Sequence, residues 1–132
     1  MVGYHVADAE KLDWEERPPA AEGLKPRQAA DVTTAAELKQ SRGRFWRYPA
    51  GTRGRRHADK AQEEVFVVIS GTLTMLLGEP PERVDVGPGS VVAVEPRTPL
   101  QARNESDEEL VMYIYGAPPE QEGADFFDDV EL

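Results

Sequence analysis

The stretch PAGTRGRRHADKAQEEVFVVISG, Pro49–Gly71, decides the fold of this chain. It begins with a Pro-Ala-Gly turn, carries His57 among arginines, and then enters the apolar run Val65–Ile69. An uninterrupted apolar run of this length is typical of a β-strand that is covered on both faces. A second stretch, VGPGSVVAVEPRTPLQARN, Val86–Asn104, also places an apolar strand between tight turns. Both stretches therefore predict strands joined by short loops.

Further short β-prone segments, separated by Gly and Pro turns, fill most of the remaining chain. They are Leu24–Val32, Gly43–Tyr48, Thr72–Leu77, Arg83–Val86, Gln101–Arg103 and Leu110–Tyr115. About seven or eight short strands, with turns every eight to twelve residues, predict an all-β sandwich or barrel. Thr33–Ser41 fits either a capped helical turn or the lead-in to a strand. We favour the strand lead-in, because the aromatic run that follows it is β-prone.

The two stretches resemble the two motifs of the cupin superfamily. The first motif has the pattern G-x5-H-x-H-x3–4-E-x6-G, and here Gly51, His57, Glu64 and Gly71 keep that spacing. Asp59 stands where the pattern has its second histidine. In the second motif Leu100 stands at the histidine position and Asn104 closes the pattern. The resemblance covers about residues 40–116.

This resemblance implies a double-stranded β-helix, or jelly roll, made of two packed antiparallel sheets. In the family, two histidines and a glutamate of the first motif and one histidine of the second converge on a metal ion inside the barrel. His57 and Glu64 remain here, Asp59 offers a hard oxygen ligand, and Leu100 offers none. Gln101 would face the other side of the strand if Leu100 points inward.

The residues agree with a reduced metal site. His57 and Asp59 are two positions apart and so share one face of a strand. One imidazole and two carboxylates suit a hard ion such as Mn²⁺ or Mg²⁺ better than Zn²⁺ or Cu²⁺. We expect no tightly bound transition metal and, if a metal binds, a divalent cation such as Mn²⁺ at partial occupancy. His57 as a surface residue, or as a vestigial position without a metal, remains open, and so does pairing of the two acids with nearby basic side chains.

Six arginines lie within the fifteen residues 42–56. Arg42 and Arg44 share a strand face with Trp46 and Tyr48, whereas Arg47 lies on the other face. An inward guanidinium would hold an anionic ligand, because it donates bidentate hydrogen bonds to carboxylate and phosphate. The predicted interior ligand-binding residues are Trp46, Arg47, Tyr48, Phe66, Met75, Leu100, Met112 and Tyr113.

The bulk composition excludes several classes of protein. Cysteine is absent, so there is no disulfide framework, thiolate site or cysteine nucleophile. The formal net charge is −10, and residues 104–132 hold ten acids but no Lys or Arg. Such a chain is a poor partner for nucleic acid, whose binding depends on phosphate neutralisation. Neither a signal peptide nor a membrane-spanning apolar run is visible, so we expect a cytoplasmic protein.

We divide the chain into an N-terminal arm with edge strands at 1–32, a cupin barrel at 33–117 and an acidic C-terminal tail at 118–132. Tyr4–Val6 is a candidate edge strand of the arm, and Trp14 is expected to anchor the arm to the barrel. The tail carries Phe126 and Phe127, so we expect it to dock on the arginine-rich region rather than to extend into solvent.

Three functions follow from these observations. The preferred one is a cupin-domain protein that binds a small molecule in its barrel and has a degenerate or absent metal site. The first alternative is a metal-dependent enzyme, a dioxygenase or an isomerase, that uses His57, Asp59 and Glu64. The second alternative is a dimeric interaction protein without a ligand. A homodimer is expected in each case, because apolar residues occur on both faces of the strands.

Overall fold

The computed structural model describes residues 2–131, and within them every regular element is a β-strand. The alternating and apolar runs of the sequence form these strands: β1 (Trp14–Arg17), β2 (Arg27–Asp31), β3 (Arg42–Tyr48), β4 (His57–Ala58), β5 (Glu63–Ser70), β6 (Leu73–Leu77), β7 (Glu82–Val86), β8 (Val91–Val94), β9 (Leu100–Arg103), β10 (Leu110–Ala117) and β11 (Asp125–Phe126). No helix in the described part of the chain is long and apolar enough to cross a membrane.

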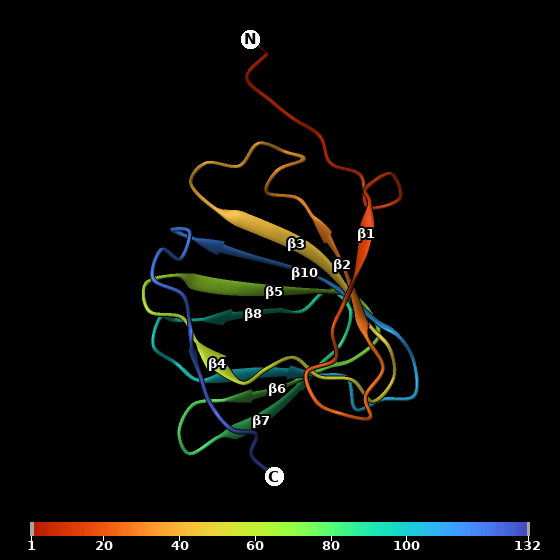
Figure 1. Ribbon diagram of the computed structural model, residues 1–132, viewed down its shortest axis with the longest axis vertical. Coiled ribbons are helices and arrows are strands. Elements are labelled where there is room, and N and C mark those ends of the chain that lie inside the picture. Colours follow the sequence, from red (N-terminus) through yellow and green to blue (C-terminus); the bar gives the residue numbers. More distant parts are fainter. Residues whose placement is uncertain (1, 132) are drawn as a thin grey trace.

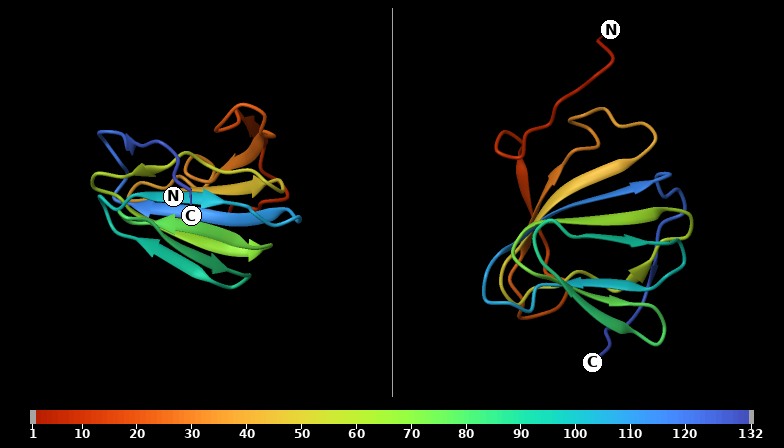
Figure 2. Two further views of the ribbon diagram at one scale, coloured as in Figure 1. Left: turned by 90° about the horizontal axis from the view of Figure 1, so that it is seen from below. Right: turned by 180° about the vertical axis from the view of Figure 1, so that it is seen from behind.

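The strands form two packed antiparallel sheets (Figure 1). The first sheet has six strands in the order β1-β2-β3-β10-β5-β8, and the second has five in the order β11-β4-β9-β6-β7. The chain crosses repeatedly from one sheet to the other, as the views from below and behind also show (Figure 2). This arrangement confirms the predicted jelly roll.

The hydrophobic core lies between the two sheets. Its buried members come from both motifs and from the strands between them: Tyr48, Phe66, Val68, Leu73, Met75, Val94, Leu100, Ala102, Leu110 and Met112. The apolar run of β5 is less enclosed than its composition predicted, because Ile69 is 48% exposed on the outer face of the sheet. Burial on that face is confined to the first half of the strand, where Val65 is covered.

The N-terminal segment extends the six-stranded sheet. Trp14 anchors it from outside: its indole nitrogen donates to the carbonyl of Ala9 at 2.8 Å, and its ring lies 3.9 Å from the guanidinium of Arg47. Residues 2–7 project from the barrel and form no strand (Figure 1), so Tyr4–Val6 is not the predicted edge strand.

The homodimer expected from the sequence stays a prediction.

The segment between β2 and β3 consists of turns rather than a helix. The amide of Ala36 donates to the carbonyl of Val32 at 2.8 Å, and the amide of Leu38 donates to that of Thr33 at 2.9 Å. Glu37 has a φ of 51°, a left-handed conformation that a continuing helix or strand would not contain. The segment therefore folds back on itself and delivers the chain to β3 at Arg42.

Asn104, which closes the second motif, cross-links the turns at one end of the barrel. Its side-chain amide donates to the carbonyls of Tyr48 at 2.8 Å and Glu108 at 2.7 Å. Its side-chain oxygen accepts from the amide and the hydroxyl of Ser106. The residue itself is fully buried, and its bond to the Tyr48 carbonyl forms away from competing water. These bonds give a structural reason for an asparagine at the last position of the second motif.

We predict that Asn104→Ala lowers the free energy of unfolding by about 1–3 kcal/mol, because it removes the buried donor to the Tyr48 carbonyl and the bonds that hold the 104–108 turn. Urea denaturation followed by tryptophan fluorescence measures the change. Ser106→Ala serves as the matched control and should cost less, since its hydroxyl lies at the exposed side of the same network. Equal losses for the two variants would contradict this role of Asn104.

Candidate functional site

A cavity of about 480 Å³ lies between the two sheets. Strand alternation decides which side chains reach it. On β3, Arg42, Arg44 and Trp46 line the cavity, and Tyr48 follows on the same face. On β5 the same rule turns Glu64 inward and leaves Glu63 exposed. The predicted common face of the β3 residues is thus confirmed.

Three potential metal ligands converge at one side of this cavity. His57 lies on β4, Asp59 directly follows β4, and Glu64 is on β5. The ligand atoms lie within 4.8 Å of one another. The Nε2 atom of His57 is 3.3 Å from Oε1 of Glu64 and 3.9 Å from Oδ1 of Asp59. The turn between β4 and β5 therefore brings these three residues together in space, whereas the sequence shows only how far apart they are along the chain.

Hydrogen bonds fix the orientation of two of these ligands. Nδ1 of His57 lies 3.0 Å from the carbonyl oxygen of Arg55, so a proton on Nδ1 is donated to that carbonyl. This tautomer leaves the lone pair of Nε2 directed at the two carboxylates. Oδ2 of Asp59 accepts from the side-chain amide of Gln62 at 2.9 Å, which leaves Oδ1 facing His57.

The close approach of these groups changes their acidity. Burial lowers the pKa of His57, but hydrogen bonds to Glu64 and to the Arg55 carbonyl, together with the charges of both carboxylates, outweigh burial and raise it. Burial also raises the pKa of Asp59, and the nearby charge of Glu64 raises it further. Two carboxylates held this close repel each other, and a bound cation would relieve that repulsion.

The three residues fit a small divalent cation. Adjacent ligand atoms around an octahedral ion with bonds of roughly 2.1 Å lie about 3 Å apart. The 3.3 Å between His57 and Glu64 is close to this spacing, whereas the 3.9 Å between His57 and Asp59 exceeds it. Leu100, the register partner of His57 across β4 and β9, also lines the cavity and offers no ligand atom. His5 pairs instead with Glu37 at 3.1 Å and takes no part in the site. The protein thus supplies three ligands, and further coordination positions would be open to small molecules.

Four arginines also line the cavity: Arg27, Arg42, Arg44 and Arg55. None of them forms an ion pair with a carboxylate within residues 2–131. Arg27 donates to the hydroxyl of Tyr48 at 3.0 Å and stacks on the ring of Trp46, while its Nε is buried without a partner. Burial lowers the pKa of Arg44, and the like charges of Arg17 and Arg42 lower it further.

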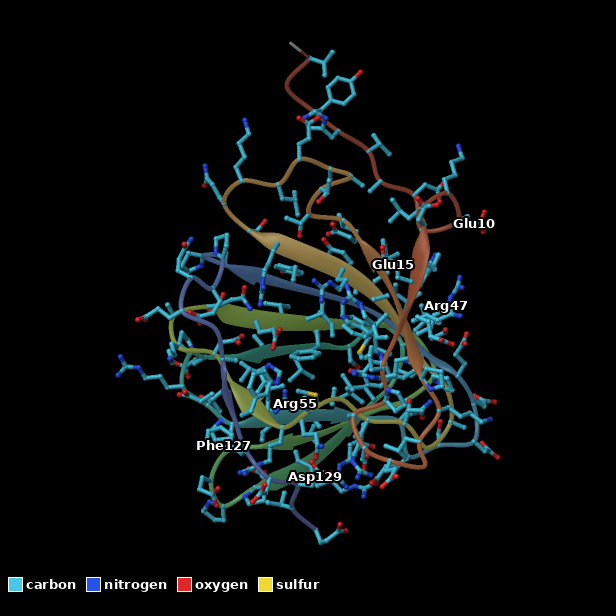
Figure 3. All side chains as sticks on the ribbon, viewed as in Figure 1. Glu10, Glu15, Arg47, Arg55, Phe127 and Asp129 are labelled. Carbon is cyan, nitrogen blue, oxygen red and sulfur yellow. The ribbon has the colours of Figure 1, made fainter. Side chains whose placement is uncertain are left out.

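The predicted interior residues divide into three groups. Trp46, Tyr48, Phe66 and Leu100 line the cavity. Met75 and Met112 are completely buried in the core instead and do not line it. Arg47 and Tyr113 were wrongly placed in the interior, because they lie on the outer face of the six-stranded sheet, where they contact Trp14 and Phe45. Figure 3 shows Arg47 beside β1 and Arg55 beside β4.

Sequence reasoning missed two contributors to the site. Arg27 comes from β2, which the prediction assigned to the arm, and it reaches the cavity because β2 pairs with β3. Gln62 lies within the first motif, yet its position between Asp59 and Arg42 depends on how the loop folds. The amphiphilic pattern of β2 was the one available signal for Arg27, and no local signal existed for Gln62.

The C-terminal tail docks on its own barrel, as predicted, but on the 53–56 loop rather than on β3. β11 pairs with β4, and Asp129 contacts Arg53 at 2.6 Å. The guanidinium of Arg55 lies 3.8 Å from the ring of Phe126. Figure 3 shows Arg55, Phe127 and Asp129 along this part of the molecule, and Gly123, Ala124 and Phe126 complete the cavity wall.

Comparison with known proteins gives a consistent picture of the fold. A family model described as a cupin domain matches residues 44–115, more than half of the chain. No curated protein sequence matches the chain significantly.

Solved structures with a similar fold have low sequence identity. A conserved protein with a double-stranded β-helix domain from Klebsiella pneumoniae is 17% identical with a TM-score of 0.71, and the match covers 94% of this chain and 97% of that one. The polyketide cyclase RemF from Streptomyces resistomycificus is 15% identical with a TM-score of 0.76, over 96% and 87% of the two chains. A sugar phosphate isomerase of the cupin superfamily from Silicibacter pomeroyi is 19% identical with a TM-score of 0.71, over 83% and 73%.

The raised pKa of His57 predicts a measurable coupling to Glu64. We expect Glu64→Gln to lower the pKa of His57 in chelator-treated protein, because the variant removes the charged hydrogen-bond partner. Nuclear magnetic resonance titration of the imidazole protons measures this pKa, and His5→Ala assigns the two histidine signals. An unchanged pKa in Glu64→Gln would show that the two side chains do not interact in solution.

The same coupling sets the direction of the pH dependence of stability. The folded-state pKa of His57 lies above its unfolded value of about 6.5. Its stabilising contribution is therefore fully present below the unfolded pKa and is lost as the pH rises through the folded pKa. The Glu64→Gln variant should lose this part of the pH dependence in urea denaturation curves.

Proposed function

The chain belongs to the cupin superfamily, and on that premise we propose that it binds a small organic anion inside its barrel, next to a weakly held divalent cation. The observation that carries this proposal is the set of four cavity arginines without a carboxylate partner in the described chain. The protein as a whole has a formal charge of −10, yet these four guanidiniums face one cavity and form no ion pair in the described chain. Like charges that face one space repel each other, as Arg42 and Arg44 do, so a bound anion would stabilise the arrangement.

The geometry favours a carboxylate or phosphate group as the anion. Guanidinium groups present a planar fork of donors that matches the oxygens of these groups. Arg44 and Arg42 alternate along β3, and Arg27 approaches from the neighbouring strand, so their donors face one space. The rest of the lining includes Trp46 and Phe66 and can take up an apolar part of the ligand.

His57, Asp59 and Glu64 would hold the cation. A divalent ion there would act as a Lewis acid that polarises an oxygen atom of the ligand. The ligand set contains only one imidazole, so hard ions such as Mn²⁺ or Mg²⁺ fit it better than Zn²⁺. In this arrangement Asp59 and Glu64 supply charge, while His57 is oriented by the Arg55 carbonyl.

A second function, metal-dependent isomerisation, is favoured by the small number of protein ligands, because a cation held by His57, Asp59 and Glu64 would also bind an oxygen of a substrate. A ligand anchored by the arginines would lie within the same cavity as the three metal ligands. Isomerisation needs only polarisation and proton transfer, which a hard, redox-inactive ion supports. A dioxygenase is less well matched, because its common ligand set contains two histidines and one carboxylate.

We expect the protein to bind Mn²⁺ with one weak site, and Glu64→Gln to weaken that binding at least tenfold by removing one of two carboxylate ligands. Isothermal titration calorimetry of chelator-treated protein with Mn²⁺ measures the affinity. Glu63→Gln is the matched control, because Glu63 is the exposed neighbour on the same strand. Equal Mn²⁺ affinity in the Glu64→Gln and Glu63→Gln variants would refute the cation site.

We expect Arg44→Gln to weaken anion binding at least about tenfold, since a charge-assisted hydrogen bond is worth roughly 1.5–3 kcal/mol. Chemical-shift titration with benzoate and, separately, with inorganic phosphate measures affinity and tells the carboxylate from the phosphate. Arg47→Gln, on the outer face of the same strand, is the control and should bind normally. If Arg44→Gln and Arg47→Gln bind both anions as the wild-type protein does, the anion does not bind at the cavity arginines.

A further inference from the structure

The C-terminal segment 118–131 forms one wall of the cavity, although it lies entirely outside the part of the chain that matches the cupin family model. We propose that Phe126 of this segment determines specificity by selecting organic anions that carry an apolar, planar group. The inference rests on the proposed anion binding and goes beyond it in naming the ligand class and the residue that recognises it.

Contacts on both sides of Phe126 hold the segment in place. On one side, a carboxylate oxygen of Glu120 accepts from the backbone amides of Lys60 at 2.6 Å and Ala61 at 2.9 Å. These bonds lower the pKa of Glu120, the bond from Ala61 most, so the carboxylate stays charged near neutral pH. On the other side, Asp129 accepts from the side-chain amide of Gln101 at 2.9 Å.

Arg103 adds a further anchor by donating to the carbonyl of Val130 at 2.8 Å. Between these anchors the chain passes the two sheets at the side where β4 lies (Figure 1). The position of Phe126 is therefore fixed by polar contacts that do not involve its own side chain. A substitution at Phe126 should leave the segment docked.

Phe126 lies beside the space that a ligand bound to the cation and the arginines would occupy. It is the register partner of His57, and the two ring centroids are 6.1 Å apart. The guanidinium of Arg55 lies 3.8 Å from the same ring. Phe126 is nevertheless 51% exposed and lines the cavity, so much of its apolar surface has no partner in the protein. A ligand that covered this surface would gain hydrophobic and stacking energy.

The other residues that line the cavity explain why the ligand would carry both a negative charge and an apolar group. The four arginines bind the anionic end, whereas Trp46, Phe66 and Leu100 line the same space with apolar surface. A small anion such as acetate would satisfy the guanidiniums and leave the aromatic surface uncovered. Benzoate would satisfy both and also reach Phe126.

Phe127 provides a natural contrast. Its amide donates to the carbonyl of Arg56 at 2.9 Å, and its ring lies 5.3 Å from the Arg56 guanidinium. It is 41% exposed, similar to Phe126, but it does not line the cavity. The two adjacent phenylalanines are therefore similarly exposed, and each ring lies beside the guanidinium of a different arginine. They differ in that Phe126 lines the cavity and Phe127 does not.

The test compares the affinities of the full-length protein for acetate and benzoate, measured by chemical-shift titration in the wild-type protein and three variants. Phe126→Ala should weaken benzoate binding about three- to tenfold and leave acetate binding unchanged, because aromatic contacts contribute energy of this order. Phe127→Ala should change neither affinity. Phe126→Leu, which keeps an apolar side chain, should recover part of the preference for benzoate.

The outcomes separate this inference from the function on which it rests. Failure of the wild-type protein to bind either anion would overturn the proposed function, and this inference with it. Binding of both anions with equal benzoate affinities in Phe126→Ala and Phe127→Ala would overturn only the role of Phe126. An equal loss of acetate and benzoate affinity in Phe126→Ala would also overturn it, because the side chain would then support the cavity without discriminating between ligands.

Discussion

The side chain of Gln62 joins the two chemically different sides of the cavity. Its amide nitrogen donates to Asp59 at 2.9 Å, and its oxygen accepts from Nε of Arg42 at 2.8 Å. It is almost completely buried, and it packs against Gly116, where an added Cβ would collide with it. One neutral side chain thus fixes a potential metal ligand and a guanidinium of the cavity wall relative to each other. Loss of either bond would leave a buried polar group unpaired, which is costly.

The arginines that form ion pairs in the described chain are not the four that line the cavity. The acidic C-terminal segment engages arginines beside the cavity, as the ion pair between Asp129 and Arg53 shows. Glu79 likewise pairs with Arg56 at 2.8 Å. The tail contacts Arg55, one of the cavity arginines, through the ring of Phe126 rather than through a carboxylate. Part of the acidic excess seen in the sequence therefore serves docking of the tail.

The fold alone says little about the chemistry of this protein. Proteins with the same architecture and less than 20% identity include one named as an isomerase and one named as a polyketide cyclase. Function in such a barrel depends on which side chains occupy a few inward positions of the strands. Here those positions carry arginines on β3, and Leu100 replaces an imidazole of the family pattern on β9. These differences leave the cavity with fewer potential metal ligands than the family pattern has, and with several guanidinium groups in its wall.

The sequence by itself determined the jelly roll, the spacing of His57 and Glu64 as potential ligands and the common face of Arg42 and Arg44, because these depend on short spacings and on strand alternation. The tertiary structure decided the rest of the site. Arg27 enters it through pairing of β2 with β3, and Phe126 through pairing of β11 with β4. It also placed Arg47 outside the barrel, because alternation groups residues by face but does not tell which face is inward. Contacts between residues far apart in the chain depend on the packing of the two sheets, and no local pattern encodes them.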